Sequence, residues 1–245
     1  MTRLIAAEWL KLRTTRFLQA MFPAAVVLSV VAVAGSIVAT DRGGIALDST
    51  RGLRRVFPVT GAGALVVLLA GILISAGEYR HGTAADTFLT TPRRHRVVLA
   101  KLGIGAAVGL GIGVATSAAC LGGAALIYRA EGVTFPFGDG EVWLTLAGTL
   151  AYTTLFAVLG VAIGTLARNQ ALALALSLAW IGLVEHILVG FAPSLGRWLP
   201  AAAGQAIVRT PLDDLLSPLA GVVVLCAYAA VIAAAGTAVA ATRDA

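Results

Sequence analysis

The chain has 245 residues, of which 59% are hydrophobic and 12% are charged, and its formal net charge is +6. Because a soluble domain carries about 25% charged residues, this composition indicates an integral membrane protein. The basic residues flank apolar stretches and form no patch with interleaved aromatic side chains, so nucleic-acid binding is not expected. Both cysteines lie inside apolar runs, so the sequence predicts neither a disulfide framework nor a metal knuckle.

Residues 1–16 precede the apolar stretches and predict a helix that lies in the membrane interface. On a helical wheel, Ile5, Trp9 and Leu12 share one side. The opposite arc holds Arg3, Glu8, Lys11, Thr14 and Thr15. An aromatic side chain at headgroup depth and basic residues near anionic lipid are typical of interfacial helices. An unstructured, positively charged flank is the alternative.

Uncharged stretches between charged residues predict six transmembrane helices, because a spanning helix needs about 20 apolar residues. The predicted spans cover residues 17–40, 57–77, 102–128, 142–167, 170–191 and 218–241. The first span is too long for the apolar region of an ordinary signal peptide, so we expect it to be retained rather than cleaved. The sequence therefore predicts an all-α integral membrane protein with one transmembrane domain, residues 1–245.

Lys and Arg residues divide unevenly between the two sides of the membrane. With the N-terminus inside, the inner segments hold 11 of the 18 Lys and Arg residues. Because cytoplasmic segments carry an excess of these residues, we expect both termini to be cytosolic. The cluster Arg51–Arg55, which falls on the outer side, argues against this orientation.

Glycines recur at helical spacing in two of the spans. Gly105, Gly109 and Gly113 repeat every four residues, and so do Gly160 and Gly164. Small residues at this spacing let helix backbones approach closely, which predicts tight packing between helices of this chain. Glycine is also simply frequent in membrane helices, so the spacing assigns no dimer face.

The segment Ala192–Pro218 is neither a clean span nor a polar loop, and it contains four prolines and Trp198. Irregular backbone is not tolerated in contact with lipid, so this segment must pack on protein or line a cavity. We expect an outer re-entrant or interfacial element between helices 5 and 6.

Motifs for catalysis are absent from the sequence. It contains no GxxxxGK[ST] phosphate-binding loop, no HExxH and no GxSxG. The three histidines, His81, His95 and His186, are far apart, so no metal site is predicted. We expect this chain to have no catalytic, cofactor-binding or metal-binding residues of its own.

Glu185 and His186 are the one ionisable pair inside a predicted span, and such groups are functional-site hypotheses by default. At 1.5 Å per residue, Glu185 lies about 22 Å from the start of its span, in the outer third of the membrane. It is interpreted as a helix-end carboxylate bonded to the following outer segment, with Arg197 as one partner. A place in a substrate path or a proton relay are the alternatives.

The stretch Gly77–Lys101 is a long polar run that the membrane interior cannot hold. Gly82 interrupts the preceding helix, Thr83 offers a capping hydroxyl, and Asp86 follows three residues later. Pro92 ends the element, because the residue before a proline avoids helical geometry. The sequence predicts a helix of about two turns that needs a docking surface.

That helix covers Ala84–Thr91, and Phe88 and Leu89 are its large apolar side chains. The basic residues that follow are Arg93, Arg94, Arg96 and Lys101. They are interpreted as a snorkelling, headgroup-binding entry to the third span.

Several of these features together resemble the permeases of type-2 ATP-binding-cassette exporters. The loop carries Glu78, Gly82-Thr83 and Pro92-Arg93, followed by basic residues. The resemblance extends to Glu8-Trp9-Leu10-Lys11-Leu12-Arg13-Thr14, Glu185, Leu199-Pro200 with Gly204, and the ending Arg243-Asp244-Ala245. It covers nearly the whole chain in the same order, and its start is similar to that of actinobacterial members.

The resemblance implies a six-helix permease subunit in a bacterial plasma membrane that exports an amphipathic or lipid-like molecule, such as a drug or antibiotic. Residues 78–101 would be the cytosolic coupling loop, with Ala84–Thr91 as the coupling helix. The implied coupling residues are Glu78, Gly82, Thr83, Asp86, Phe88, Leu89, Pro92, Arg93, Arg94 and Arg96. The implied partners are membrane lipids, a second permease copy or paralogue, and separate ATPase subunits that bind ATP and Mg²⁺.

Two other functions remain open at this stage. One is a membrane-embedded lipid-modifying enzyme, which the shortage of intramembrane acids and histidines disfavours. The other is a membrane anchor or sensor subunit that does not itself transport.

Overall fold

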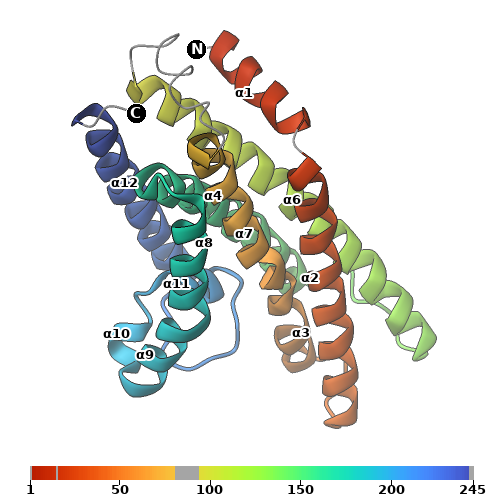
Figure 1. Cartoon of the computed structure of the whole chain (residues 1–245). Helices are drawn as coiled ribbons and strands as arrows, with labels where there is room; N and C mark the ends of the chain where they lie inside the picture. The colour runs from red at the N-terminus through yellow and green to blue at the C-terminus, as the bar shows by residue number, and fades with distance from the viewer. Residues whose placement is uncertain (1, 15, 81–93, 243–245) are drawn as a thin grey trace.

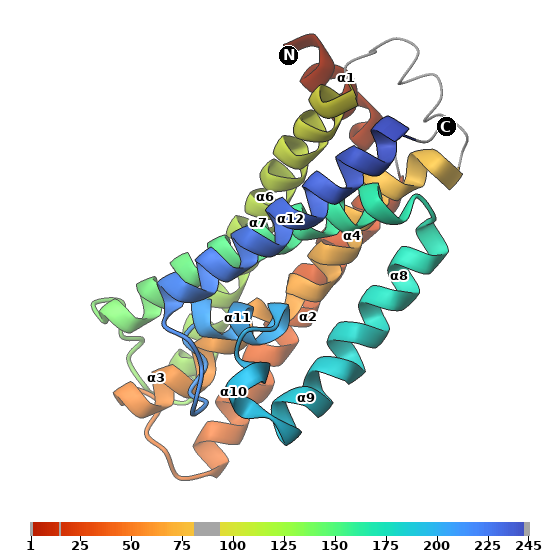
Figure 2. The same cartoon turned by 90° about the vertical axis from the view of Figure 1, so that its left-hand side faces the viewer.

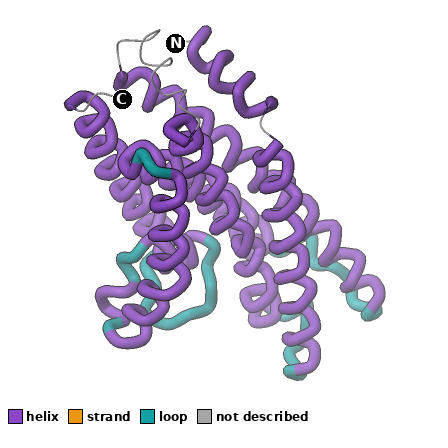
Figure 3. The backbone as a smooth tube through the Cα atoms, in the orientation of Figure 1, coloured by secondary structure: helices purple, strands orange, loops and turns teal. Residues whose placement is uncertain are grey.

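The computed structural model of the chain describes residues 2–14, 16–80 and 94–242. Within these ranges every regular element is a helix and no strand occurs (Figure 3). Six helical segments are long and apolar enough to cross a membrane. The predicted class, an all-α protein with six spans, is therefore confirmed.

The N-terminal part begins with α1 (Thr2–Thr14), which runs beside the start of α6 rather than in line with the helix that follows (Figure 1). That following helix, α2 (Arg16–Arg42), forms the first span and contains Pro23. A helix at residues 1–16 was expected, and α1 lies there. Its position in a membrane interface stays a prediction.

The second span is not one uniform helix. It consists of α3 (Thr50–Val56), the 3-10 helix η1 (Phe57–Gly63) and α4 (Ala64–Arg80). Ser49 begins α3 by accepting a hydrogen bond from the Gly52 N–H, and the Gly63 N–H donates to the Ser29 hydroxyl of α2 at 2.9 Å. The apolar helical stretch therefore starts at Thr50, before the residue 57 expected from the charges.

The centre of the bundle is α7 (Gly140–Ala167), which packs on α4, α6 and α12. Most of one side of this helix is buried, and its Phe156 and Leu159 belong to the main apolar core. Asp139 caps its first turn through the Glu141 N–H. At its other end, Arg168 adopts a left-handed backbone with φ of 51°, which turns the chain sharply into the next helix.

Glycines bring α7 into close contact with α6 and α4. A Cβ added at Gly109 of α6 (Arg94–Ala130) would lie 2.7 Å from the Thr153 carbonyl oxygen of α7. A Cβ at Gly164 of α7 would lie 2.6 Å from the Ile72 carbonyl oxygen of α4. The predicted tight packing within the chain is confirmed, because side chains at these positions would force the backbones apart.

The fifth span is α8 (Gln170–Ala179), the π-helical segment η2 (Trp180–Val184) and α9 (Glu185–Phe191). Two short helices follow, α10 (Pro193–Gly196) and α11 (Pro200–Ile207), and then the last span, α12 (Pro218–Thr242). In Figure 2, α8 and α9 run at one side of the molecule, apart from α12.

The segment between helices 5 and 6 packs on protein, as expected from its irregular sequence. Nearly all of α11 is buried, and it contacts α7, α9 and α12. Gly204 lies directly against the ring of Tyr152, where a Cβ would not fit. Its depth in a membrane, and so its re-entrant character, stays a prediction.

Candidate functional site

The coupling loop is described only at its two ends. Glu78 lies in the last turn of α4, and Arg94 and Arg96 lie in the first turn of α6. Seven predicted coupling residues, Gly82, Thr83, Asp86, Phe88, Leu89, Pro92 and Arg93, fall outside the described residues. The predicted helix Ala84–Thr91 falls there too, so these assignments stay predictions.

Both ends of the loop are joined to α1 by a ring of four charges. The Lys101 ammonium of α6 lies 2.9 Å from a Glu8 carboxylate oxygen and 2.8 Å from one of Glu78. The Lys11 ammonium lies 2.7 Å from the other Glu8 oxygen and 2.8 Å from Glu78. Each lysine therefore bridges both glutamates, and the net charge of the ring is zero. We call these four residues the four-charge ring.

The ring is buried on one side and open to solvent on the other. The side chains of Glu8 and Lys101 are only 4% and 5% exposed, whereas that of Lys11 is 43% exposed. A buried charge is costly unless it is paired and hydrogen-bonded, and both buried members satisfy this requirement. These ion pairs therefore hold α1 against α4 and α6. Removing any single one of them would lower the stability of the protein.

The ionisation of the ring reflects this pairing. Burial raises the pKa of the Glu8 carboxyl, but the two lysines outweigh that effect and hold the pKa below its usual value. Burial lowers the pKa of the Lys11 ammonium, but its hydrogen bonds to Glu78 and Glu8 reverse the shift and raise the pKa. Both shifts favour the charged forms of Glu8 and Lys11.

Two readings of the sequence change at this site. Lys101 was expected to snorkel toward lipid headgroups, and this is wrong, because its ammonium is buried between Glu8 and Glu78. Lys11, one of the basic residues expected near anionic lipid, pairs with Glu8 and Glu78 of the protein instead. The spacing of Glu8 and Lys11, three residues apart on a helix, is a signal for a charge pair. The spacing does not reveal that these two side chains also form ion pairs with Glu78 and Lys101.

Glu185 is the first residue of α9, a helix at the opposite end of the bundle from α1 (Figure 1), and it is almost fully buried. One of its carboxylate oxygens accepts a hydrogen bond of 2.7 Å from the Ala201 N–H at the start of α11. Arg197 was the expected partner; among the described residues it forms no ion pair with Glu185 and lies over the Trp198 ring instead.

His186 does not share the surroundings of Glu185. It is exposed, and its Nδ1 lies 3.2 Å from the Ile181 carbonyl oxygen of the π-helical segment. The wider turn of η2 directly precedes Glu185, whose N–H donates to the Trp180 carbonyl. The geometry therefore joins Glu185 to the outer segment and separates it from His186.

Neither site has the composition of a catalytic or metal centre. In the part of the chain that the structure describes, no group of three or more His, Cys, Asp or Glu side chains could hold a metal ion. The four-charge ring has no nucleophile, and its carboxylates are neutralised by lysines. What the ring can do is hold three helices in one arrangement.

Comparison with known proteins agrees with this picture of a multi-pass membrane protein. The family model described as "ABC-2 family transporter protein" matches residues 4–183, which is more than half of the chain. The match covers α1 from residue 4 onward, both described ends of the coupling loop, all of α8 and the first four residues of η2, and it ends before Glu185. A comparison with curated proteins gave no match. The chain therefore belongs to the ABC-2 family of transporter proteins, as a membrane-spanning component of the permease type.

Proposed function

We propose that the chain is the permease subunit of an ATP-driven exporter, which moves an amphipathic or lipid-like molecule, such as a drug or antibiotic, out of a bacterial cell. Separate ATPase subunits bind ATP and Mg²⁺ and act on the coupling loop. The observation that carries this proposal is the four-charge ring, because it joins both ends of the loop to α1 through ion pairs of 2.7–2.9 Å.

Coupling requires that a displacement of the loop reaches the spans without being absorbed locally. Glu78 and Lys101 are in the helices that enter and leave the loop, α4 and α6, and the ring holds these helices together. Both helices pack on α7 through glycine contacts that leave little room for sliding. Packed helices with two discrete arrangements transmit such a shift, whereas a soft joint would not.

The polarity of the spans supports this class of cargo. Among the described residues, the charged side chains that are buried are Glu8, Lys101 and Glu185. The first two neutralise each other, and Glu185 is bonded to the backbone of α11. Such an interior suits a molecule with a large apolar part better than a polar solute.

The exposed apolar surface supports an assembly. The spans formed by α2, by α8 to α9 and by α12 are buried over only a small part of their length. Their exposed side chains suit lipid and a second permease copy or paralogue. Both described ends of the chain lie at the same end of the bundle as the last turn of α4 and the first turn of α6 (Figure 1). We propose that this end is cytosolic and that the membrane is the bacterial plasma membrane.

The test is the ATPase activity of the partner that co-purifies with the chain, reconstituted in nanodiscs. Phe88→Asp and Leu89→Asp are expected to abolish the stimulation of that ATPase by the permease. Glu78→Gln is expected to reduce the stimulation while the partner still binds, because it weakens the ring and not the docking surface. Glu131→Gln, an exposed change outside the loop, is the matched control.

Two outcomes would overturn the proposal. ATPase activity that is indifferent to Phe88→Asp and Leu89→Asp would support a membrane anchor or sensor that does not transport. Turnover of a lipid by the purified chain without any partner, abolished by Glu185→Ala, would support a membrane-embedded enzyme.

A further inference from the structure

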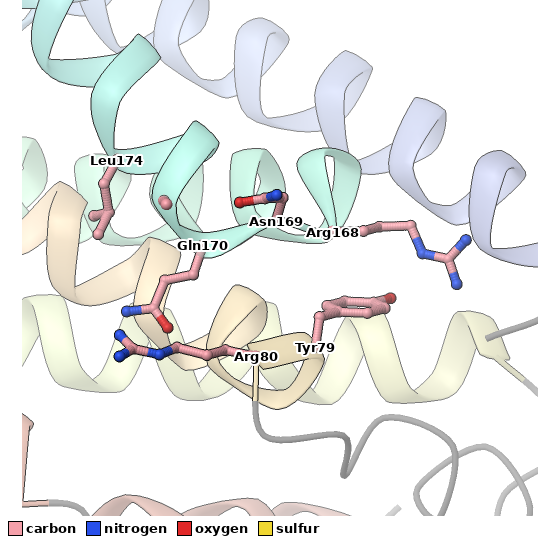
Figure 4. Close-up of a pocket in the computed structure, with 7 residues that line it drawn as sticks. Tyr79, Arg80, Arg168, Asn169, Gln170 and Leu174 are labelled. Atoms are coloured by element: carbon pink, nitrogen blue, oxygen red, sulfur yellow. The ribbon is translucent and has the colours of Figure 1, made fainter.

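A polar pocket opens where the second span ends and the fifth span begins. Its volume is about 510 Å³, and its lining includes Tyr79 and Arg80 of α4 and Gln170 and Leu174 of α8. Figure 4 shows Arg80 beside Gln170 at one end of the pocket and Arg168 beside Tyr79 at the other. Three candidate spans end or begin here, at Arg80, Ala167 and Gln170, and lipid headgroups surround the ends of membrane-spanning helices.

The turn between α7 and α8 shapes this pocket. After the left-handed Arg168, Asn169 caps α8 by accepting a hydrogen bond of 3.1 Å from the Leu172 N–H. The N–H groups of Gln170 and Ala171 have no helical partner, because they belong to the first turn. The start of α8 thus adds hydrogen-bond donors and a positive dipole end to the pocket.

The two arginines of the pocket carry charge that the described protein does not neutralise. Arg80 is exposed, and within the described ranges neither Arg80 nor Arg168 forms an ion pair. The Arg168 guanidinium lies 5.1 Å from the centre of the Tyr79 ring. The neighbouring carboxylate, Glu78, is already engaged by two lysines. The pocket therefore presents two cations to an anionic ligand.

A separate apolar crevice lies farther along the same helix. Its volume is about 430 Å³, and it lies between α8 with η2, α7 and α12. Its lining includes Leu159, Ile163, Leu176, Trp180, Tyr228 and Ile232. It also includes Ser177, which is less than one helical turn beyond Leu174 of the polar pocket. Along α8, a cationic pocket is thus followed by an apolar crevice that runs toward the membrane interior.

We propose that these two hollows together bind one anionic phospholipid. The phosphate lies beside Arg80 and the first turn of α8, Arg168 adds positive charge at the other end of the same pocket, and an acyl chain lies in the crevice. Arginine and helix N-termini are both suited to phosphate oxygens. The order of the two hollows, charged at the membrane boundary and apolar inside it, matches a phospholipid and not a free phosphate or an acidic protein segment. This binding goes beyond transport and does not depend on it.

The first arm of the test measures lipid retained by the purified full chain in native mass spectrometry. The probe is an equimolar mixture of phosphatidylglycerol and phosphatidylcholine. The wild type is expected to retain phosphatidylglycerol preferentially. Arg80→Gln and Arg168→Gln are each expected to weaken this preference about fivefold, the effect of one basic residue near an anionic surface. Arg42→Gln, an exposed arginine at the far end of α2, is the control and is expected to change nothing.

The second arm of the test uses a substitution that fills the apolar crevice. Ala179→Trp places a large ring in the crevice, whereas Ala175→Trp places the same ring on α8 outside the crevice lining. Both alanines are exposed, so both variants are expected to fold. Loss of bound phosphatidylglycerol in Ala179→Trp but not in Ala175→Trp supports the proposal.

Three results would overturn it. One is a phosphatidylglycerol preference in the Arg80→Gln/Arg168→Gln double variant equal to that of the wild type. Another is displacement of the lipid by millimolar inorganic phosphate with no effect of Ala179→Trp, which would assign the pocket to free phosphate. The third is loss of the co-purifying ATPase in the double variant with unchanged lipid retention, which would assign the arginines to a protein partner.

Discussion

Two buried carboxylates near opposite ends of the bundle are stabilised in different ways. Glu8, beside the coupling loop, is held by the ammonium groups of Lys11 and Lys101. Glu185, at the other end, is held by a backbone N–H of the next short helix, at Ala201. The first carboxylate connects elements far apart in the sequence, and the second closes a local connection of 16 residues.

This difference separates two roles for a buried charge. Every member of the four-charge ring takes part in two ion pairs, because each lysine bridges two glutamates. Glu185 needs only an oxygen that accepts a hydrogen bond. The ring therefore suits a joint that must move as a unit, and Glu185 suits the anchoring of α11. Each of the following changes affects one of these roles more than the other.

The largest loss of stability is expected for Lys101→Met. It leaves Glu8 buried with only Lys11 as a partner, and breaking a buried pair in this way costs about 3–5 kcal/mol. The apparent melting temperature of the chain in detergent should fall clearly below that of Arg96→Met, an exposed change in the same helix. Adding Glu8→Gln should recover part of the loss, because it removes the unpaired charge. Equal melting temperatures for Lys101→Met and Arg96→Met would contradict a structural role of the ring.

A smaller loss is expected for Glu185→Ala. It leaves the buried Ala201 N–H without an acceptor, which costs about 1–3 kcal/mol. Glu185→Gln keeps an acceptor oxygen and should retain most of the stability in the same melting experiment. If Glu185→Gln were as damaging as Glu185→Ala, the charge itself would matter at both ends, and the two sites would be alike.

The pH dependence of the stabilisation by the four-charge ring distinguishes this site further from Glu185. The pKa of Glu8 is lowered, so its stabilisation is present above the ordinary value of about 4.3 and is lost as the pH falls through the lowered pKa. The pKa of Lys11 is raised, so its stabilisation is present below the ordinary value of about 10.4 and is lost as the pH rises through the raised pKa. The docking of α1 should therefore stay constant from about pH 5 to pH 10.

The distance between spin labels at Ile5 of α1 and Leu99 of α6, both exposed positions, measures this docking. The same label pair in Lys101→Met serves as the control and should show a broader distance distribution. A distance that shifts between pH 6 and pH 8 would contradict the assignment of these charges.

The smallest effect is expected for an exposed ion pair. Arg54 of α3 lies 2.8 Å from Glu141 of α7, but more than half of its side chain is exposed. Exposed pairs contribute little, because water already solvates both ions. The melting temperature of Arg54→Gln should match that of Arg51→Gln, which removes a neighbouring exposed arginine. A clearly lower value for Arg54→Gln would show that pairing alone, without burial, is enough to stabilise this bundle.

The sequence alone determined the number and approximate place of the spans. Length and continuity of apolar residues are local properties, and the membrane requires about 20 such residues for each crossing. The glycine spacing in α6 and α7 also predicted close helix packing, because the missing side chains are themselves the cause. The polar run at 78–101 is predicted to lie outside the membrane for the same local reason.

Only the tertiary structure decided which charges meet. Glu8 and Lys101 are 93 residues apart, and their contact depends on how α1, α4 and α6 are rotated about their axes. A one-residue rotation turns a side chain by about 100°, which the spacing of charges in one helix does not reveal. The choice of Ala201 rather than Arg197 as the partner of Glu185 depends likewise on the path of α10 and α11. Helix length is encoded locally, whereas contacts between helices are decided by packing.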